Sequence, residues 1–98
     1  MIVAVFARTL RANVSVEQLV AAWAPESEEP YPAQVEVALD PADARRIMTI
    51  IRFDGSMQDF EKAMPRLTHS QSHQRLAEVV ESTELEGVYE SVVVSVGQ

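Results

Sequence analysis

Apolar residues fill both alternating rows of the stretch Arg45–Gly55, which we predict to be a strand at the centre of one small sheet. Successive side chains of a strand point to opposite faces. One face therefore receives Ile47, Thr49, Ile51 and Phe53, and the other receives Met48, Ile50 and Arg52. Because a strand covered on one side only would alternate between apolar and polar residues, this pattern predicts cover on both sides of the sheet.

The first third of the chain predicts a strand followed by a helix. Met1–Leu10 is rich in Val and Ile and is predicted to be a central strand beside Arg45–Gly55. Asn13–Pro25 is predicted to be a helix, because Ser15 and Gln18 have the spacing of a capping box. Its buried stripe has the i, i+3, i+4, i+7 spacing and consists of Val16, Leu19, Val20 and Trp23.

The remaining segments predict a hairpin, helical structure and a last strand. Ala33–Asp40 alternates as an edge strand does and is joined to Arg45–Gly55 by a turn at Pro41. Ser56 is placed to cap a second helix, which Pro65 should break or kink. Ser70–Ser82 is predicted to be helical, and the pattern leaves open whether it is a separate helix. We predict the last strand at Gly87–Val96.

The predicted order β-α-β-β-α-β is that of the ferredoxin-like α+β fold, a four-stranded antiparallel sheet with its helices on one face. The other face of the sheet would carry either Val3 and Val5 or Ile2 and Phe6, with apolar residues of neighbouring strands. Such an apolar patch is large for a monomer. We therefore expect a homodimer that packs sheet against sheet.

Composition bounds the class of protein. The 98 residues predict one domain spanning 1–98, and the chain contains no Cys, which excludes thiolate chemistry. A net charge of −7 with scattered basic residues argues against nucleic-acid binding. The apolar run Met1–Ala7 is too short to cross a bilayer, so we expect no membrane association and a cytoplasmic protein.

Three stretches resemble the dimeric α/β-barrel superfamily, and within it the antibiotic-biosynthesis-monooxygenase-like domains. They are RTLRANVSVEQLVAAW, LDPADARRIMTIIRFDGSMQDF and HSQSHQRLAEVV. The resemblance implies a sheet-to-sheet dimer and a pocket between sheet and helices. The chain departs from the family pattern at two places. It has Phe53 where Trp is frequent, and it lacks a Gly at the start of the second strand. The superfamily also contains haem-degrading enzymes, isomerases and stress-response proteins, so the resemblance does not determine the reaction.

The two histidines are the first candidates for chemistry. His69 and His73 share a helical face if their segment is one continuous helix. The resemblance places His73 at a helix histidine common in these domains, where it could act as a general base, a ligand-binding donor or a haem ligand. A half-buried structural role is the simpler interpretation. A metal site needs a third protein ligand, which the sequence does not place, so we expect no metal.

Four more residues are candidates for substrate binding, each with a structural alternative. Arg52 is a charge inside a central strand and either reaches the pocket or pairs at the rim or across the dimer. Trp23 and Tyr31 flank a Pro-rich loop and could wall a pocket, although Trp23 also fits the core. Asn13 follows the first strand and is either a pocket residue or a turn residue.

Two classes of function follow. The first is a small-molecule-binding enzyme, a cofactor-independent monooxygenase acting on an aromatic or polyketide-like substrate, with His73 as its polar group. The second is a non-enzymatic dimeric binding or stress-response module whose histidines are structural. We expect no cofactor, with haem as a weaker third option. An open cavity lined by His69, His73 and Arg52 would favour the first class.

Overall fold

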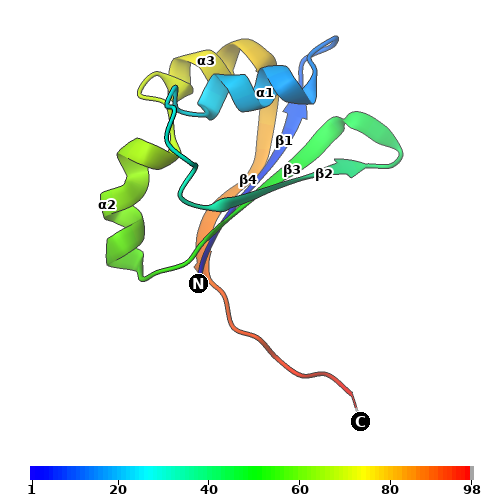
Figure 1. Ribbon diagram of the computed structural model, residues 1–98. Coiled ribbons are helices and arrows are strands. Elements are labelled where there is room, and N and C mark those ends of the chain that lie inside the picture. The colour runs from blue at the N-terminus through cyan, green and yellow to red at the C-terminus, as the bar shows by residue number, and fades with distance from the viewer. Residues whose placement is uncertain (98) are drawn as a thin grey trace.

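A computed structural model describes residues 1–97, which form a four-stranded antiparallel sheet with three helices (Figure 1). The strands are β1 (Ile2–Leu10), β2 (Gln34–Asp40), β3 (Asp43–Phe53) and β4 (Val80–Glu90). The helices are α1 (Val16–Trp23), α2 (Met57–Leu67) and α3 (Ser72–Val79). The strand order β2-β3-β1-β4 is that of the ferredoxin-like fold, which confirms the predicted fold class.

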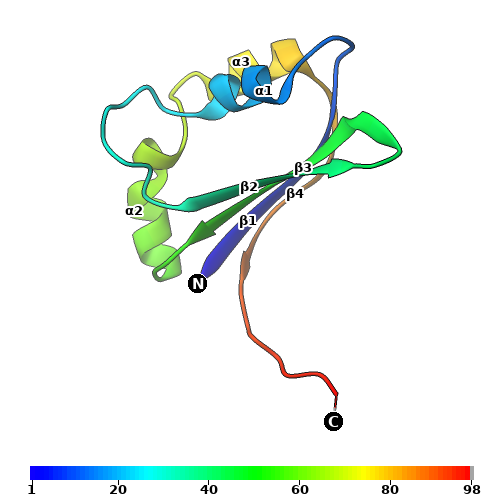
Figure 2. The same cartoon turned by 45° about the vertical axis from the view of Figure 1, so that its right-hand side comes forward.

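β3 lies inside the sheet, between β2 and β1, as its two apolar rows predict. The row containing Ile47, Thr49, Ile51 and Phe53 is buried, and the row containing Met48, Ile50 and Arg52 is half-buried. The helices all lie on one side of the sheet (Figure 2). Register pairs Val3 with Arg52 and Val5 with Ile50, so these side chains belong to the face away from the helices. We call that side the bare face.

The first two helices begin where local sequence predicts. The Ser15 hydroxyl accepts a hydrogen bond from the Gln18 amide nitrogen at 3.1 Å, and the Gln18 side chain accepts one from the Ser15 amide nitrogen at 2.8 Å. Ser56 and Asp59 form the same reciprocal pair at the start of α2. Each box satisfies two amide groups that have no partner within the helix, which fixes the first residue of both helices.

Of the break or kink predicted at Pro65, the break does not occur, because α2 continues through Pro65 to Leu67. Pro65 lies in the last turn, where its missing N–H removes one helical hydrogen bond and the carbonyl of Met64 still accepts a bond from Thr68. The next helix is separate and shorter than the predicted Ser70–Ser82, since α3 spans Ser72–Val79. The helical region that the sequence left open is therefore two helices.

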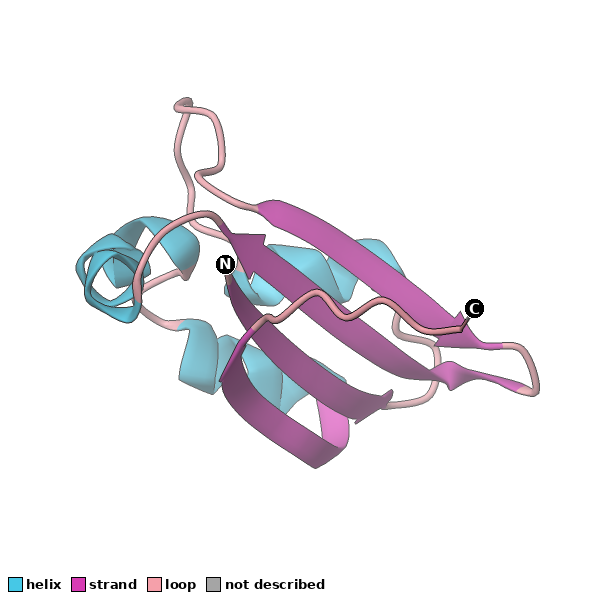
Figure 3. Cartoon of the chain, turned by 90° about the horizontal axis from the view of Figure 1, so that it is seen from below, coloured by secondary structure: helices cyan, strands magenta, loops and turns pink. Residues whose placement is uncertain are grey.

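The predicted last strand, Gly87–Val96, was misplaced toward the C-terminus. β4 begins directly after α3 and pairs along β1 from Leu10↔Val80 to Ile2↔Glu90. Once β1 is fully paired, residues 91–97 have no strand beside them, and they lead away from the sheet (Figures 1 and 2). Seen from below, they pass in front of the strands (Figure 3). The last backbone hydrogen bond runs from the Ser91 amide to the Met1 carbonyl, at 2.8 Å. We call residues 91–97 the C-terminal arm.

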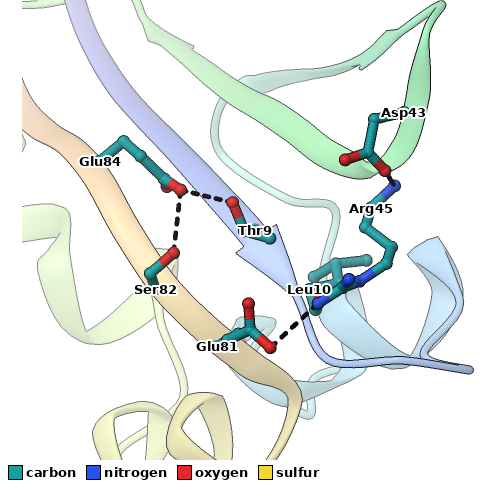
Figure 4. Close-up of polar contacts among 7 residues, drawn as sticks. All are labelled: Thr9, Leu10, Asp43, Arg45, Glu81, Ser82 and Glu84. Atoms are coloured by element: carbon teal, nitrogen blue, oxygen red, sulfur yellow. Dashed lines mark hydrogen bonds and ion pairs between the residues drawn. The ribbon is translucent and has the colours of Figure 1, made fainter.

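Side-chain hydrogen bonds join neighbouring strands at the end of the sheet opposite the arm (Figure 4). The Arg45 guanidinium donates to the Leu10 carbonyl at 2.9 Å and to Glu81 at 3.0 Å, which ties β3 to the ends of β1 and β4. Thr9 and Ser82 both donate to the Glu84 carboxylate. None of the helices in residues 1–97 is long and apolar enough to cross a membrane.

Candidate functional site

A cleft runs between the helix-facing side of the sheet and helices α2 and α3. It consists of three adjoining hollows, of about 230, 310 and 150 Å³, that share wall residues. We call it the inner cleft. Its walls include Phe6, Arg8, Thr49, Ile51, Met64, Thr68, His73, Leu76 and Glu86. The lining is mostly apolar and aromatic with a few polar groups, which is the usual composition of a small-molecule site.

Two buried polar atoms at this cleft have no hydrogen-bond partner within residues 1–97. They are the hydroxyl Oγ1 of Thr49 and the indole Nε1 of Trp23. Thr49 is 1% exposed and comes from the helix-facing row of β3, and Trp23 is 5% exposed and comes from the last turn of α1. Buried polar groups are nearly always paired, so two unpaired ones in residues that line the same cavity are an exception and mark this cavity as a candidate ligand site.

Arg8 supplies a buried positive charge to the same cleft. It lies in β1 opposite Ile47, is 8% exposed, and holds its guanidinium 4.5 Å from the ring centre of Phe6. Burial lowers the pKa of the Arg8 guanidinium, and the Glu86 carboxylate partly opposes that shift. No ion pair joins Arg8 to any other described residue, so an anionic ligand would find this charge available.

His73 lies at the exposed end of the cleft. It comes from the first turn of α3 and lines the two hollows of about 230 and 310 Å³, which meet at Arg8 and Glu86. His73 is exposed to solvent, and the apolar residues of the cleft lie deeper than it does. Of the candidate residues, His73 and Trp23 are therefore the two that the fold brings to this cleft.

Arg52 does not reach the inner cleft. It belongs to the bare-face row of β3, where its guanidinium lies 2.8 Å from the Glu36 carboxylate of β2. Both side chains are about half exposed, at 42% and 56%, so the pair contributes little to stability. The sheet itself separates Arg52 from the helices, so it is not a pocket residue, and it pairs with Glu36 of the neighbouring strand.

His69 is not on a helix with His73, because it lies in the loop between α2 and α3. Its Nδ1 accepts a hydrogen bond from the Gln71 amide at 2.9 Å, and its own amide donates to the Trp23 carbonyl at 2.7 Å. These bonds fasten the loop to the end of α1. Asn13 has φ 66 in the exposed turn after β1 and lines none of the three hollows of the inner cleft.

A second hollow, of about 580 Å³, lies under the Pro-rich loop between α1 and β2. Trp23 and Tyr31 wall it, with ring centres 6.0 Å apart in an edge-to-face arrangement. The Tyr31 hydroxyl already donates to the Leu67 carbonyl at 2.6 Å, and burial raises its pKa to about 12. The hollow is larger than any single hollow of the inner cleft, but its aromatic hydroxyl is already hydrogen-bonded and its charged residues are exposed, so it is the weaker candidate.

Sequence reasoning missed Arg8, Thr49 and Glu86. Arg8 lies two residues after Phe6 in β1, so both side chains point to the helix-facing side of the sheet. A charge within an inner strand was the reason for choosing Arg52, and the same reason applies to Arg8. Thr49 occupies a row otherwise made of Ile and Phe, where a hydroxyl is the exception. Glu86 was not considered because the last strand was predicted to begin at Gly87, one residue after it. Residues 1–97 contain no cluster of His, Asp or Glu suited to a metal ion.

Comparisons with known proteins show the fold. No family model and no curated protein matches the chain. A "putative Antibiotic biosynthesis monooxygenase" from Chloroflexus aurantiacus is similar in structure, with a TM-score of 0.62, 16% identity, and 96% and 95% of the two chains covered. A dimeric ferredoxin-like protein of unknown function from Bacteroides fragilis has a TM-score of 0.52 and 23% identity, with 92% and 95% covered.

Proposed function

We propose that the chain is a homodimeric small-molecule-binding protein whose inner cleft is the active site of a cofactor-independent monooxygenase. The observation that carries this proposal is the pair of unpartnered buried polar groups, Thr49 and Trp23, at a cleft that also contains the unpaired Arg8. Its apolar walls suit the rings of an aromatic or polyketide-like substrate. Its donors suit an oxygen atom that becomes negatively charged.

The proposed reaction converts an activated CH2 group beside a carbonyl into a second carbonyl. His73 removes a proton from the CH2, and Arg8 and Thr49 stabilise the negative charge that develops on the carbonyl oxygen. The resulting carbanion gives electrons to O2 and bonds to one of its oxygen atoms. That atom becomes the new ketone oxygen and the other leaves as water, so the balance is CH2 + O2 → C=O + H2O.

The proposed homodimer forms through the bare face. Its central row contains Val3, Val5 and Ile50, and β4 adds Leu85 and Tyr89, which are 40% and 52% exposed. Covering this face would remove apolar surface from water, which is the main force in protein association. A protein of similar fold from Bacteroides fragilis is dimeric, which supports a dimer of this chain.

Oxygen consumption with anthrone, a three-ring ketone with an acidic CH2, tests the enzymatic proposal. The protein should raise the rate of oxygen uptake above the spontaneous rate and yield anthraquinone. His73→Ala should return the rate to the spontaneous one. Gln74→Ala is the matched control, because Gln74 is the exposed neighbour of His73 on α3 and lies outside the inner cleft. Full turnover by the His73→Ala variant would remove His73 from the mechanism.

The competing proposal is a binding or stress-response module that uses the same cleft without catalysis. The exposure of His73 favours it, since a general base usually gains from partial burial. Binding of aromatic anions without any oxygen uptake would support this alternative against the enzymatic one.

A further inference from the structure

The C-terminal arm is an apolar strand-like segment without a partner. Its valines Val92, Val93, Val94 and Val96 are 78%, 96%, 71% and 90% exposed. The arm contains no charged residue and no Pro, and Val favours strands. Uncharged segments of six or seven residues with this composition pair readily with a free strand edge. An unpaired arm would therefore be poorly solvated and prone to associate.

The sheet offers such an edge at β2. Strand order places β2 outermost with β3 on its inner side, so half of its backbone N–H and C=O groups point outward. β2 has seven residues, as the arm does. Val35 and Leu39 on this strand are 40% and 53% exposed, so an added strand would also cover apolar side chains.

Residues 91–97 are too few to pair along β2 of their own chain. It starts beside Met1, at the end of the sheet where Gln34 begins β2, but β1 and β3 lie between. A strand added outside β2 lies four strand spacings from β4, which is about 19 Å. Seven extended residues span about 23 to 25 Å, which leaves about one or two residues for pairing. Folding back on β4 would need a tight turn directly after Glu90, and residues 91–96 contain no Gly, Asn or Pro for one.

We propose that the C-terminal arm of each chain pairs with the β2 edge of a second copy and adds a fifth strand to the partner's sheet. This inference rests on the proposed homodimer and assigns the arm as a second contact beyond the bare face. Two-fold symmetry would repeat the exchange, so both arms and both β2 edges would be paired at once.

Deleting residues 91–98 tests the arm separately from the dimer. The full chain should be dimeric in sedimentation equilibrium. The deletion should raise the dimer dissociation constant at least about tenfold, because exposing even one buried Val side chain weakens association by that ratio. Amide hydrogen exchange in residues 34–40 should be faster in the deletion variant. Unchanged values of both would overturn the arm proposal while leaving a bare-face dimer in place, whereas a monomeric full chain would overturn both.

The absence of Cys in the sequence allows a direct test of exchange between chains. Val94→Cys protein mixed with Ala38→Cys protein should form a mixed dimer with a short bismaleimide, because Val94 and Ala38 are near the middle of the arm and of β2. Glu17→Cys on α1 is the control partner and should not react with Val94→Cys. Equal cross-linking to Ala38→Cys and Glu17→Cys would overturn the proposed pairing.

Discussion

Trp23 and Thr49 both line the inner cleft, and their Nε1 and Oγ1 atoms are buried without a hydrogen-bond partner in residues 1–97. They come from different elements, the end of α1 and the centre of β3. Burying an unpaired hydroxyl or N–H costs about 1 to 3 kcal/mol each. These two unsatisfied groups at one cavity are the basis of the proposal that a ligand binds in the inner cleft.

Arg8→Gln should weaken binding of 2-naphthoate about tenfold or more, because the buried guanidinium is the positive charge available to the carboxylate. Isothermal titration calorimetry measures this. Binding of the neutral 2-naphthamide should change far less. Arg66→Gln, an exposed Arg on α2, is the control and should bind as the unchanged protein does. Equal losses for the acid and the amide would contradict a charge-specific role of Arg8.

Ile50→Asp should convert the proposed dimer to a monomer, because it places a carboxylate in the middle of the bare face opposite Val5. Light scattering at micromolar concentration measures the mass. Met57→Asp changes an apolar residue that is 43% exposed on α2, on the side away from the bare face, and should leave the dimer intact. A dimeric Ile50→Asp variant would show that the bare face is not the interface.

The capping box of α2 should make stability depend on acidic pH. Hydrogen bonds from the Ser56 amide and hydroxyl lower the pKa of the Asp59 carboxyl. The folded state binds the Asp59 proton less tightly than the unfolded state does, so ionisation of this carboxyl stabilises the fold. This stabilisation is present above the ordinary Asp pKa of about 3.9 and is lost as pH falls through the lower pKa of the folded state. Thermal unfolding between pH 2 and 7 should show a shallower loss for Asp59→Asn. Parallel pH curves for the two proteins would argue against this role.

Haemin should produce no Soret shift that depends on His73. The histidine lies at the exposed end of the cleft, and the buried end offers a hydroxyl, an indole N–H and a guanidinium, none of which binds haem iron. Absorbance spectra of the unchanged protein and the His73→Ala variant should coincide during titration. A Soret shift that disappears in His73→Ala would favour a haem-linked function instead.

Local signals were predictable from the sequence, and long-range pairing was not. The capping boxes at Ser15 and Ser56 depend on residues three positions apart, so the sequence states them directly. The last strand was misplaced because two neighbouring runs both favour β structure, and only one of them fits beside β1. The valine run has the higher strand propensity, but the shorter connection from α3 selects Val80–Glu90.

The candidate site was predicted in part for the same reason. Arg8 and Arg52 are both charges in inner strands, and the alternation within each strand is clear. Which row faces the helices depends on how the strands and helices pack, and that put Arg8 in the cleft and Arg52 on the bare face. His73 reached the cleft as expected, whereas His69 did not, because the helical region divides between them.

Thr49→Val gives the most direct test of the inner cleft as a ligand site, because it removes the buried hydroxyl while nearly preserving shape. Stability by chemical denaturation and binding of 2-naphthoate by calorimetry are measured on the same variant. We predict a gain of about 1 kcal/mol in the free energy of unfolding, together with about tenfold weaker binding. A Thr49→Val protein that is less stable and binds 2-naphthoate unchanged would contradict the account.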